Sequence, residues 1–131
     1  MQVIADKTEV GLSDEAWKVL SDLKEHKVFE EMLDGYRMGV AHAIATGEIV
    51  PAVTKRRNMF HVGSLDPDHA LRDVVIELYP EAADAPYSTI ERLAEAGVKE
   101  IGRLWQDDRM NFGEICKLAL QAGVPPVRDV E

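Results

Sequence analysis

Residues 7–46, KTEVGLSDEAWKVLSDLKEHKVFEEMLDGYRMGVAHAIAT, decide the fold that we predict for this 131-residue chain. In the first six of these residues, Thr8, Val10 and Leu12 share one face of an extended segment, and polar or small residues alternate with them. This alternation predicts a half-buried strand. Ser13 is a suitable N-cap for the helix that follows, because its hydroxyl can accept a hydrogen bond from an early amide of that helix.

The second helix of this stretch is expected from about residue 30 to residue 46, and it carries Gly35, Gly39 and Ala43 at a spacing of four. A glycine inside a helix costs roughly 1 kcal/mol relative to alanine, so this alignment indicates that another backbone passes close by. Packing within the chain and a crossing between the two chains of a dimer both fit the spacing.

The order of one strand and two helices resembles the ribbon-helix-helix proteins, which are small dimers that bind DNA. The resemblance implies that the strand pairs with the same strand of a second chain, since such a unit cannot bury its apolar faces alone. A paired ribbon would direct Lys7 and Glu9 into the major groove of DNA. The expected dimer interface consists of Thr8, Val10, Leu12, Gly35, Gly39 and Ala43.

The densest basic cluster of the chain, Lys55, Arg56 and Arg57, follows the second helix in a stretch that reads as a connecting loop or a short extended segment. These cations suit contacts to DNA phosphates, and a dimer would present them twice. Together with Lys7 and Glu9 they make up the expected DNA-binding set. A solvated loop that balances neighbouring acidic residues is the alternative interpretation.

The remainder of the chain predicts helices. Asp66, followed by proline, predicts a helix start, and Pro80 predicts the end of that helix. Gly97 predicts a break between two shorter helices, and Asn111 begins the last expected helix. Cys116 is expected on the buried face of this last helix as a small core residue rather than as a nucleophile.

The expected fold class is therefore mainly α, with a short N-terminal strand followed by about five or six helices. One compact domain is expected over residues 1–124. Within it, residues 7–46 form the ribbon-helix-helix-like unit and residues 66–122 form a helical C-terminal part. Residues 125–131, which begin with two prolines, are expected to form a flexible tail.

The formal net charge of -9 opposes attraction to nucleic-acid phosphate. Residues 1–60 hold eight Lys or Arg against ten Asp or Glu, whereas residues 61–131 hold seven against fourteen. Any contact with DNA is therefore expected in the first half. The acidic second half, including Glu91, Glu95 and Glu100, suits docking onto a basic surface of another protein.

Four candidate metal ligands, His61, Asp66, Asp68 and His69, lie within nine residues. Their spacing matches no established site, and the sequence contains no phosphate loop and no motif of a nucleophilic or zinc-dependent hydrolase. No metal, no cofactor and no enzymatic activity are expected. A small metal-dependent enzyme that uses His61 and His69 is the third alternative.

Three phrases carry a second resemblance: SDEAW at 13–17, VFEEMLDGYRMGVAHAIATG at 28–47 and IERLAEAGVKEIGRLW at 90–105, with the basic connector between the last two. Their order is similar to that of small accessory proteins encoded beside bacterial DNA phosphorothioation and phage-defence systems. This resemblance implies an accessory or regulatory role near DNA-modifying machinery.

The sequence thus favours a non-enzymatic, DNA-associated homodimer, and an acidic protein-protein interaction adaptor without direct DNA binding is the alternative. The chain shows neither a secretion signal nor an apolar run long enough to span a membrane, and its single cysteine cannot form an internal disulfide. A cytoplasmic location is expected.

Overall fold

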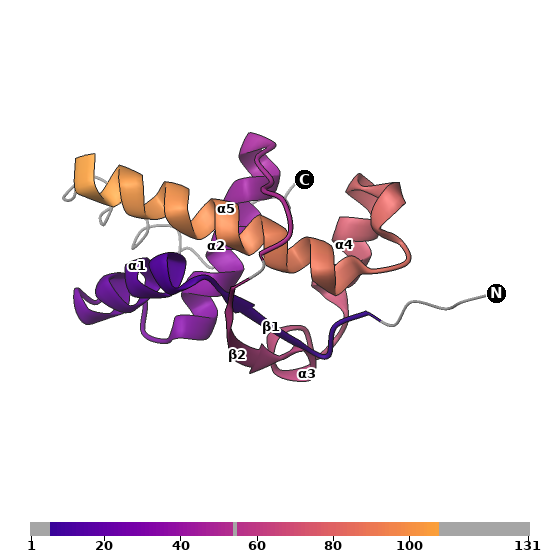
Figure 1. Cartoon of the computed structure of the whole chain (residues 1–131), viewed down its shortest axis with the longest axis horizontal. Coiled ribbons are helices and arrows are strands. Elements are labelled where there is room, and N and C mark those ends of the chain that lie inside the picture. Colours follow the sequence, from indigo (N-terminus) through magenta and orange to yellow (C-terminus); the bar gives the residue numbers. More distant parts are fainter. Residues whose placement is uncertain (1–5, 54, 108–131) are drawn as a thin grey trace, which may run out of the picture.

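The computed structural model of the chain describes residues 6–53 and 55–107. Figure 1 shows a helical molecule with one small antiparallel sheet, so the expected fold class is confirmed. The elements in chain order are β1 (Glu9–Leu12), α1 (Asp14–Glu25), α2 (Met32–Thr46), β2 (Arg57–His61), α3 (Val62–Leu65), α4 (Ala70–Leu78), a 3₁₀ turn (Pro80–Ala82) and α5 (Pro86–Asp107).

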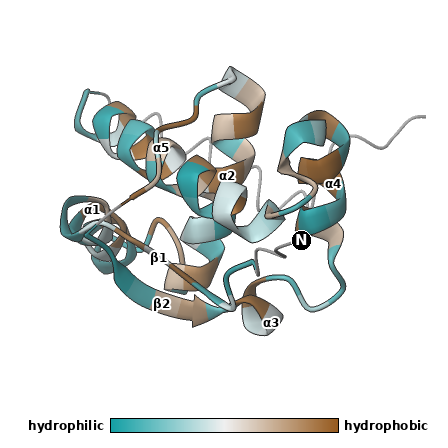
Figure 2. Ribbon diagram, turned by 45° about the vertical axis from the view of Figure 1, so that its right-hand side comes forward, coloured by the Kyte–Doolittle hydropathy of each residue, from teal (hydrophilic) through white to brown (hydrophobic). Residues whose placement is uncertain are grey.

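Helix α5 is the centre of the packing. It contacts α2, α1, α4 and β1, and Figure 1 shows it crossing the molecule with these elements against it. The fully buried core joins side chains from these elements, among them Val10, Leu12, Leu20, Tyr36, Val40, Ile90, Leu93 and Ile101. In Figure 2 most of β1 has the hydrophobic colour, whereas β2 begins hydrophilic. The first strand therefore belongs to the core of its own chain.

Helices α2 and α5 approach each other closely at Gly39 and Gly97. A Cβ atom added at Gly97 would lie 1.7 Å from the carbonyl oxygen of Gly39, so no side chain fits there. The prediction that Gly97 breaks a helix is wrong, because α5 runs through it without interruption. This glycine allows two backbones to approach rather than ending a helix.

The line of small residues on α2 is buried within the chain. A Cβ atom at Gly35 would collide with Leu20 and Phe29, and Ala43 has no exposed surface. Of the two interpretations left open by the sequence, packing within the chain is the one that the structure contains. Gly35, Gly39 and Ala43 therefore leave no surface for a dimer crossing, because residues of the same chain already fill their surroundings.

The partner of β1 is β2 of the same chain. The two strands run antiparallel, Glu9 lies opposite His61, and a bulge interrupts the register after Val10. The premise that a second chain must cover the N-terminal strand is wrong, because the connector supplies a partner strand and Leu12 is fully buried without a second copy. Homodimer formation itself stays a prediction.

Two further sequence-based expectations fall on residues that the structure does not describe. The helix expected from Asn111, with Cys116, and the tail over 125–131 lie outside the described residues. Within residues 6–53 and 55–107, no helix combines the length and the apolar character that crossing a membrane requires.

Asp66 caps α4 from a distance. The helix begins at Ala70 rather than directly after Asp66, but the Asp66 carboxylate still accepts from the N–H groups of Leu71 at 2.9 Å and Arg72 at 3.0 Å. It also accepts from the hydroxyl of Tyr87 at 2.9 Å. The capping role expected for Asp66 is thus present, and it links α4 to the start of α5.

Because the Tyr87 hydroxyl donates to Asp66, we predict that the chain loses stability at alkaline pH. Burial, followed by the hydrogen bond to Asp66, raises the pKa of Tyr87 from 10.0 to about 12. The folded chain therefore holds this proton more tightly than the unfolded chain, so the contribution is complete below about pH 10 and is lost as the pH rises through about 12.

In urea titrations at a series of pH values, the difference in unfolding free energy between the natural chain and Tyr87→Phe is expected to change by about 2 kcal/mol between these limits. Taking the difference cancels the contribution of Tyr36, whose pKa burial also raises. A difference that stays constant with pH contradicts this role of Tyr87.

Candidate interaction surfaces

Two glutamates on α5 are almost completely buried, with Glu91 1% and Glu95 3% exposed. The Glu91 carboxylate accepts from the backbone N–H of Gly11 in β1 at 2.9 Å. It also lies 3.5 Å from the Lys7 ammonium and 3.3 Å from Nε of the Arg56 guanidinium. One carboxylate therefore joins α5, the N-terminal strand and the basic connector.

Glu95, one helical turn later, holds the start of α1. It accepts from the backbone N–H of Ser13 at 3.0 Å and from its hydroxyl at 2.6 Å, and the hydroxyl oxygen accepts from the N–H of Ala16. Ser13 is thus the N-cap that the sequence predicted. Burial lowers the pKa of Lys99, but the hydrogen bond and the charge of Glu95, 3.2 Å away, outweigh it and raise the pKa overall.

These contacts correct the expectation that Glu91, Glu95 and Glu100 form an acidic docking surface. Glu91 and Glu95 are turned inward, because β1 and the start of α1 have backbone N–H groups that need acceptors inside the protein. Glu100 keeps 23% of its side chain exposed and pairs with Arg103. Glu91 and Glu95 are therefore not available as a docking surface.

Tyr36 of α2 closes the outer edge of β1 together with Glu91. Its hydroxyl donates to the carbonyl oxygen of Gly11 at 3.1 Å, while Glu91 accepts from the N–H of the same residue. Burial raises the pKa of Tyr36 well above its usual value, and the charge of Glu91 adds to this effect. The hydroxyl therefore remains a donor, and both backbone groups of Gly11 are satisfied by side chains.

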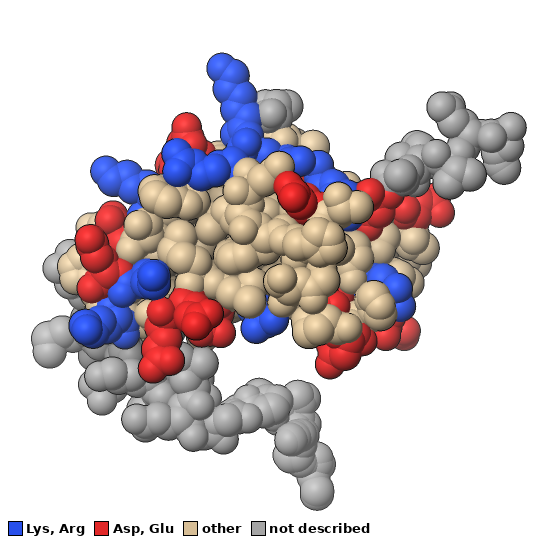
Figure 3. Space-filling view, turned by 90° about the horizontal axis from the view of Figure 1, so that it is seen from below, with Lys and Arg blue, Asp and Glu red and all other residues tan. Residues whose placement is uncertain are grey.

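The structure brings the cations of the expected DNA-binding set near the two-stranded sheet, and three of them make ion pairs with other described residues. Lys7 and Arg56 contact Glu91, while Arg57 lies 3.3 Å from Asp14 and 4.3 Å above the ring of Trp17. Lys55 and Glu9 are exposed, and Lys55 makes no ion pair with a described residue. Figure 3, which views the molecule from below, shows several basic side chains along its upper margin with acidic side chains among them.

The four candidate metal ligands have structural contacts of their own. His61 accepts from the N–H of Gly63 through Nδ1 at 3.0 Å and caps α3, and Asp66 is buried as the cap of α4. Asp68 accepts from the N–H of Ala70, and His69 lies 3.4 Å from the hydroxyl of Tyr87. Within the described part of the chain, no group of three His, Cys, Asp or Glu side chains is arranged to hold a metal ion.

An acidic and partly apolar surface lies at helix α4, within the acidic second half of the chain. Val74 is 45% and Leu78 is 53% exposed, and their spacing of four places them on one side of the helix. The one basic residue near this pair in the sequence is the partly exposed Arg72. Five exposed acids lie near the pair in the sequence: Asp68, Asp73, Glu77, Glu81 and Asp84. This α4 surface, defined by Val74, Leu78 and these acids, combines apolar area with strong negative charge.

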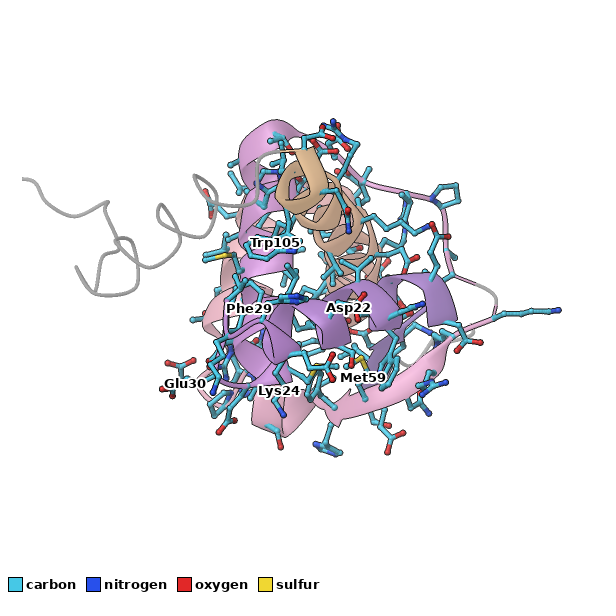
Figure 4. The ribbon with its side chains drawn as sticks, turned by 90° about the vertical axis from the view of Figure 1, so that its left-hand side faces the viewer. Asp22, Lys24, Phe29, Glu30, Met59 and Trp105 are labelled. Carbon is cyan, nitrogen blue, oxygen red and sulfur yellow. The ribbon has the colours of Figure 1, made fainter. Side chains whose placement is uncertain are left out.

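A hollow of about 250 Å³ lies between α1 and α5. Its lining mixes acidic, basic and apolar side chains, including Asp22 and Trp105, which Figure 4 labels on the two helices. The ring of Trp105 also lies against His26 with 5.7 Å between centroids. The same figure labels Lys24, Phe29 and Glu30, which line a second hollow at the link between α1 and α2. Neither lining favours one class of ligand.

Comparison of the chain with protein-family models, with curated proteins and with solved structures finds no match. The function must therefore be inferred from the surfaces themselves. Sequence reasoning missed the α4 surface because Val74 and Leu78 fit the apolar repeat of a core helix. The signal for it was present in the five acids around that repeat, which exceed what a buried helix usually carries.

Proposed function

We propose that the chain is a protein-interaction adaptor whose α4 surface docks onto a basic, partly apolar surface of another protein. The observation that carries this proposal is the exposure of Val74 and Leu78, at 45% and 53%, among acidic side chains. Exposed apolar side chains ringed by charge are typical of docking sites, and the surrounding acids select a partner of opposite sign.

The charge distribution of the rest of the molecule supports this role. Arg56 and Lys7 share the buried Glu91, and Arg57 is engaged by Asp14 and Trp17, so these basic groups do not offset the acids of α4. The resemblance to accessory proteins of DNA-modification and phage-defence systems supports an enzyme that acts on nucleic acid as partner, since such enzymes present basic surfaces.

A synthetic amphipathic helical peptide of leucine and lysine residues serves as the probe. We expect the chain to bind it, and we expect the double variant Val74→Ser and Leu78→Ser to weaken binding by about tenfold, which corresponds to about 1.4 kcal/mol. Fluorescence anisotropy of the labelled peptide measures the affinity. Because both side chains are exposed, thermal unfolding of the variant should change little.

The matched control is Ile49→Ser, which removes another exposed apolar side chain, 39% exposed, from a different part of the chain. This variant should leave the affinity unchanged. An equal loss of affinity in Ile49→Ser, or no loss in the double variant, contradicts a specific role of α4. Replacing Asp73 and Glu77 by their amides should reduce the salt dependence of binding.

Direct contact with DNA is the second candidate function, and the exposed cation Lys55 beside Arg57 is the observation that favours it. Contacts this few imply weak binding with a shallow salt dependence. Absence of any shift of duplex DNA by the purified chain at low salt would end this candidate.

A further inference from the structure

The two outer edges of the small sheet differ. At β1, the N–H and the carbonyl group of Gly11 point away from β2, and Glu91 and Tyr36 bind them. Side chains of two helices thus take the place of a neighbouring strand. The outer edge of β1 is closed at this position.

The hydrogen-bond alternation of the sheet shows which groups of β2 point outward. The N–H of Val62 donates to the carbonyl oxygen of Thr8, so Thr8 and Val62 form a hydrogen-bonded pair. Hydrogen-bonded and non-hydrogen-bonded pairs alternate along an antiparallel ladder. The next pair, Glu9 and His61, is therefore non-hydrogen-bonded, and its backbone N–H and carbonyl groups point away from the partner strand. Gly11 lies opposite Asn58 and directs its backbone toward α5, so Asn58 directs its own N–H and carbonyl group away from β1. The outer edge of β2 therefore presents the N–H groups of Asn58 and His61.

No described residue from outside the sheet bonds to these outward N–H groups, in contrast to the arrangement at Gly11. The side chains of Arg57, Asn58 and His61 are exposed, so solvent reaches this edge. In Figures 1 and 2, β2 lies at the lower margin of the molecule. An open strand edge is a template for another strand.

Basic side chains lie beside this edge, although the whole chain is acidic and the exposed Asp14 lies 3.3 Å from Arg57. Lys55 is exposed, Arg57 keeps 50% of its side chain exposed, and Arg56 contacts the side chain of Asn58. A peptide segment that binds along this edge would lie beside the cations at the start of β2, so acidic side chains on the segment would complement this charge.

We propose that the outer edge of β2 binds an extended acidic segment of another protein as a third strand of the sheet. Backbone hydrogen bonds to Asn58 and His61 provide the pairing, and Lys55 and Arg57 select for acidic side chains. This site is separate from the α4 surface and does not depend on it. With both surfaces occupied, the chain would bridge a basic partner and an acidic one.

The probe is a synthetic peptide in which glutamate alternates with valine, and the same peptide with glutamine in place of glutamate tests the charge. Amide hydrogen exchange of the full chain, followed by NMR, should show that the acidic peptide slows exchange at Asn58 and His61. The glutamine peptide should bind several-fold more weakly. Unchanged exchange at both amides under saturating acidic peptide overturns the proposal.

A pair of variants isolates the backbone donor. Asn58→Ala keeps the N–H, whereas Asn58→Pro removes it at a position where proline is tolerated because the N–H does not serve the ladder with β1. We expect Asn58→Pro to bind the acidic peptide about tenfold more weakly than Asn58→Ala. Equal affinity of the two folded variants overturns the proposal. If Asn58→Pro does not fold, the exchange experiment on the natural chain decides.

Two alternative occupants give distinct results in the same experiments. Duplex DNA that displaces the acidic peptide and binds Asn58→Pro and Asn58→Ala equally would assign the edge to phosphate contacts and overturn strand addition. Protection of Asn58 that rises with protein concentration, without peptide, would assign the edge to a second copy of the chain and would also overturn the proposal.

Discussion

Replacing Glu91 by alanine is expected to lower the free energy of unfolding by about 3 kcal/mol, because three groups lose one acceptor. The N–H of Gly11 would be left without its partner at 2.9 Å, and Lys7 and Arg56 would lose the buried charge between them. The side chain of Lys7 is 29% exposed and that of Arg56 is 23% exposed, so water compensates part of the free-energy cost of their lost partner. Gly11 is buried and gains no such relief.

Urea unfolding followed by circular dichroism measures this loss. The control is Glu100→Ala on the same helix, where a partly exposed pair with Arg103 is removed and a change within about 0.5 kcal/mol is expected. Glu91→Gln should fall between the two variants, since an amide oxygen still accepts from Gly11 but carries no charge. A Glu91→Ala variant as stable as Glu100→Ala contradicts the bridging role of this carboxylate.

Gly97→Ala is expected to destabilise the chain by about 3 kcal/mol, although alanine is the better helix former by roughly 1 kcal/mol. The added Cβ would lie 1.7 Å from the carbonyl oxygen of Gly39 and 2.9 Å from its Cα. Both obstacles are backbone atoms of α2, so the two helices would have to move apart. The resulting gap would weaken the contact on which the core rests.

The matched control is Gly102→Ala in the same helix, where the added Cβ meets side-chain atoms of Val19, the nearest at 2.5 Å. A side chain can shift more easily than a backbone, so we expect the control to cost at least about 1 kcal/mol less than Gly97→Ala. Thermal and urea unfolding measure both variants. Equal destabilisation by the two variants would show that the contact between α2 and α5 is less restrictive than described.

Local signals in the sequence predicted the elements correctly where propensity and packing agree. Ser13 caps α1, as the sequence predicted, because its hydroxyl and the acidic residues after it favour a helix start. Gly47 ends α2 in the left-handed conformation, as a C-terminal glycine should. The strand before Ser13 also formed where its alternation indicated.

Pairing and burial were not predictable from such local signals. The sequence described Glu91 and Glu95 as surface acids, since glutamate is rarely buried, and nothing near them indicates that backbone groups of β1 and Ser13 require acceptors 80 residues away. The same limit applied to β2, since the sequence left open whether the connector is a loop or a short extended segment. Gly97 was ambiguous because a helix break and a close approach of two helices both favour a residue without a Cβ atom.

The expected DNA-binding set also shows that local sequence signals do not reveal which side chains make contacts in the folded chain. Its cations lie near one sheet, but the buried Glu91 engages Lys7 and Arg56, while Arg57 keeps 50% of its side chain exposed beside Asp14. Only contacts in three dimensions distinguish a cation that stabilises the fold from one that remains available to a ligand. Among the described residues, α4 and the outer edge of β2 are the surfaces that we propose for binding.

Strand β1 pairs with β2 of its own chain, so the N-terminal half needs no second copy to cover this strand. In a non-hydrogen-bonded antiparallel pair such as Glu9 and His61, the two Hα atoms lie close together and give a strong NOE. NMR on a mixture of isotope-labelled and unlabelled chains separates contacts within a chain from contacts between chains. We predict that the NOE between Glu9 and His61 arises only within one chain. An NOE between Glu9 of a labelled chain and His61 of an unlabelled chain would contradict the account.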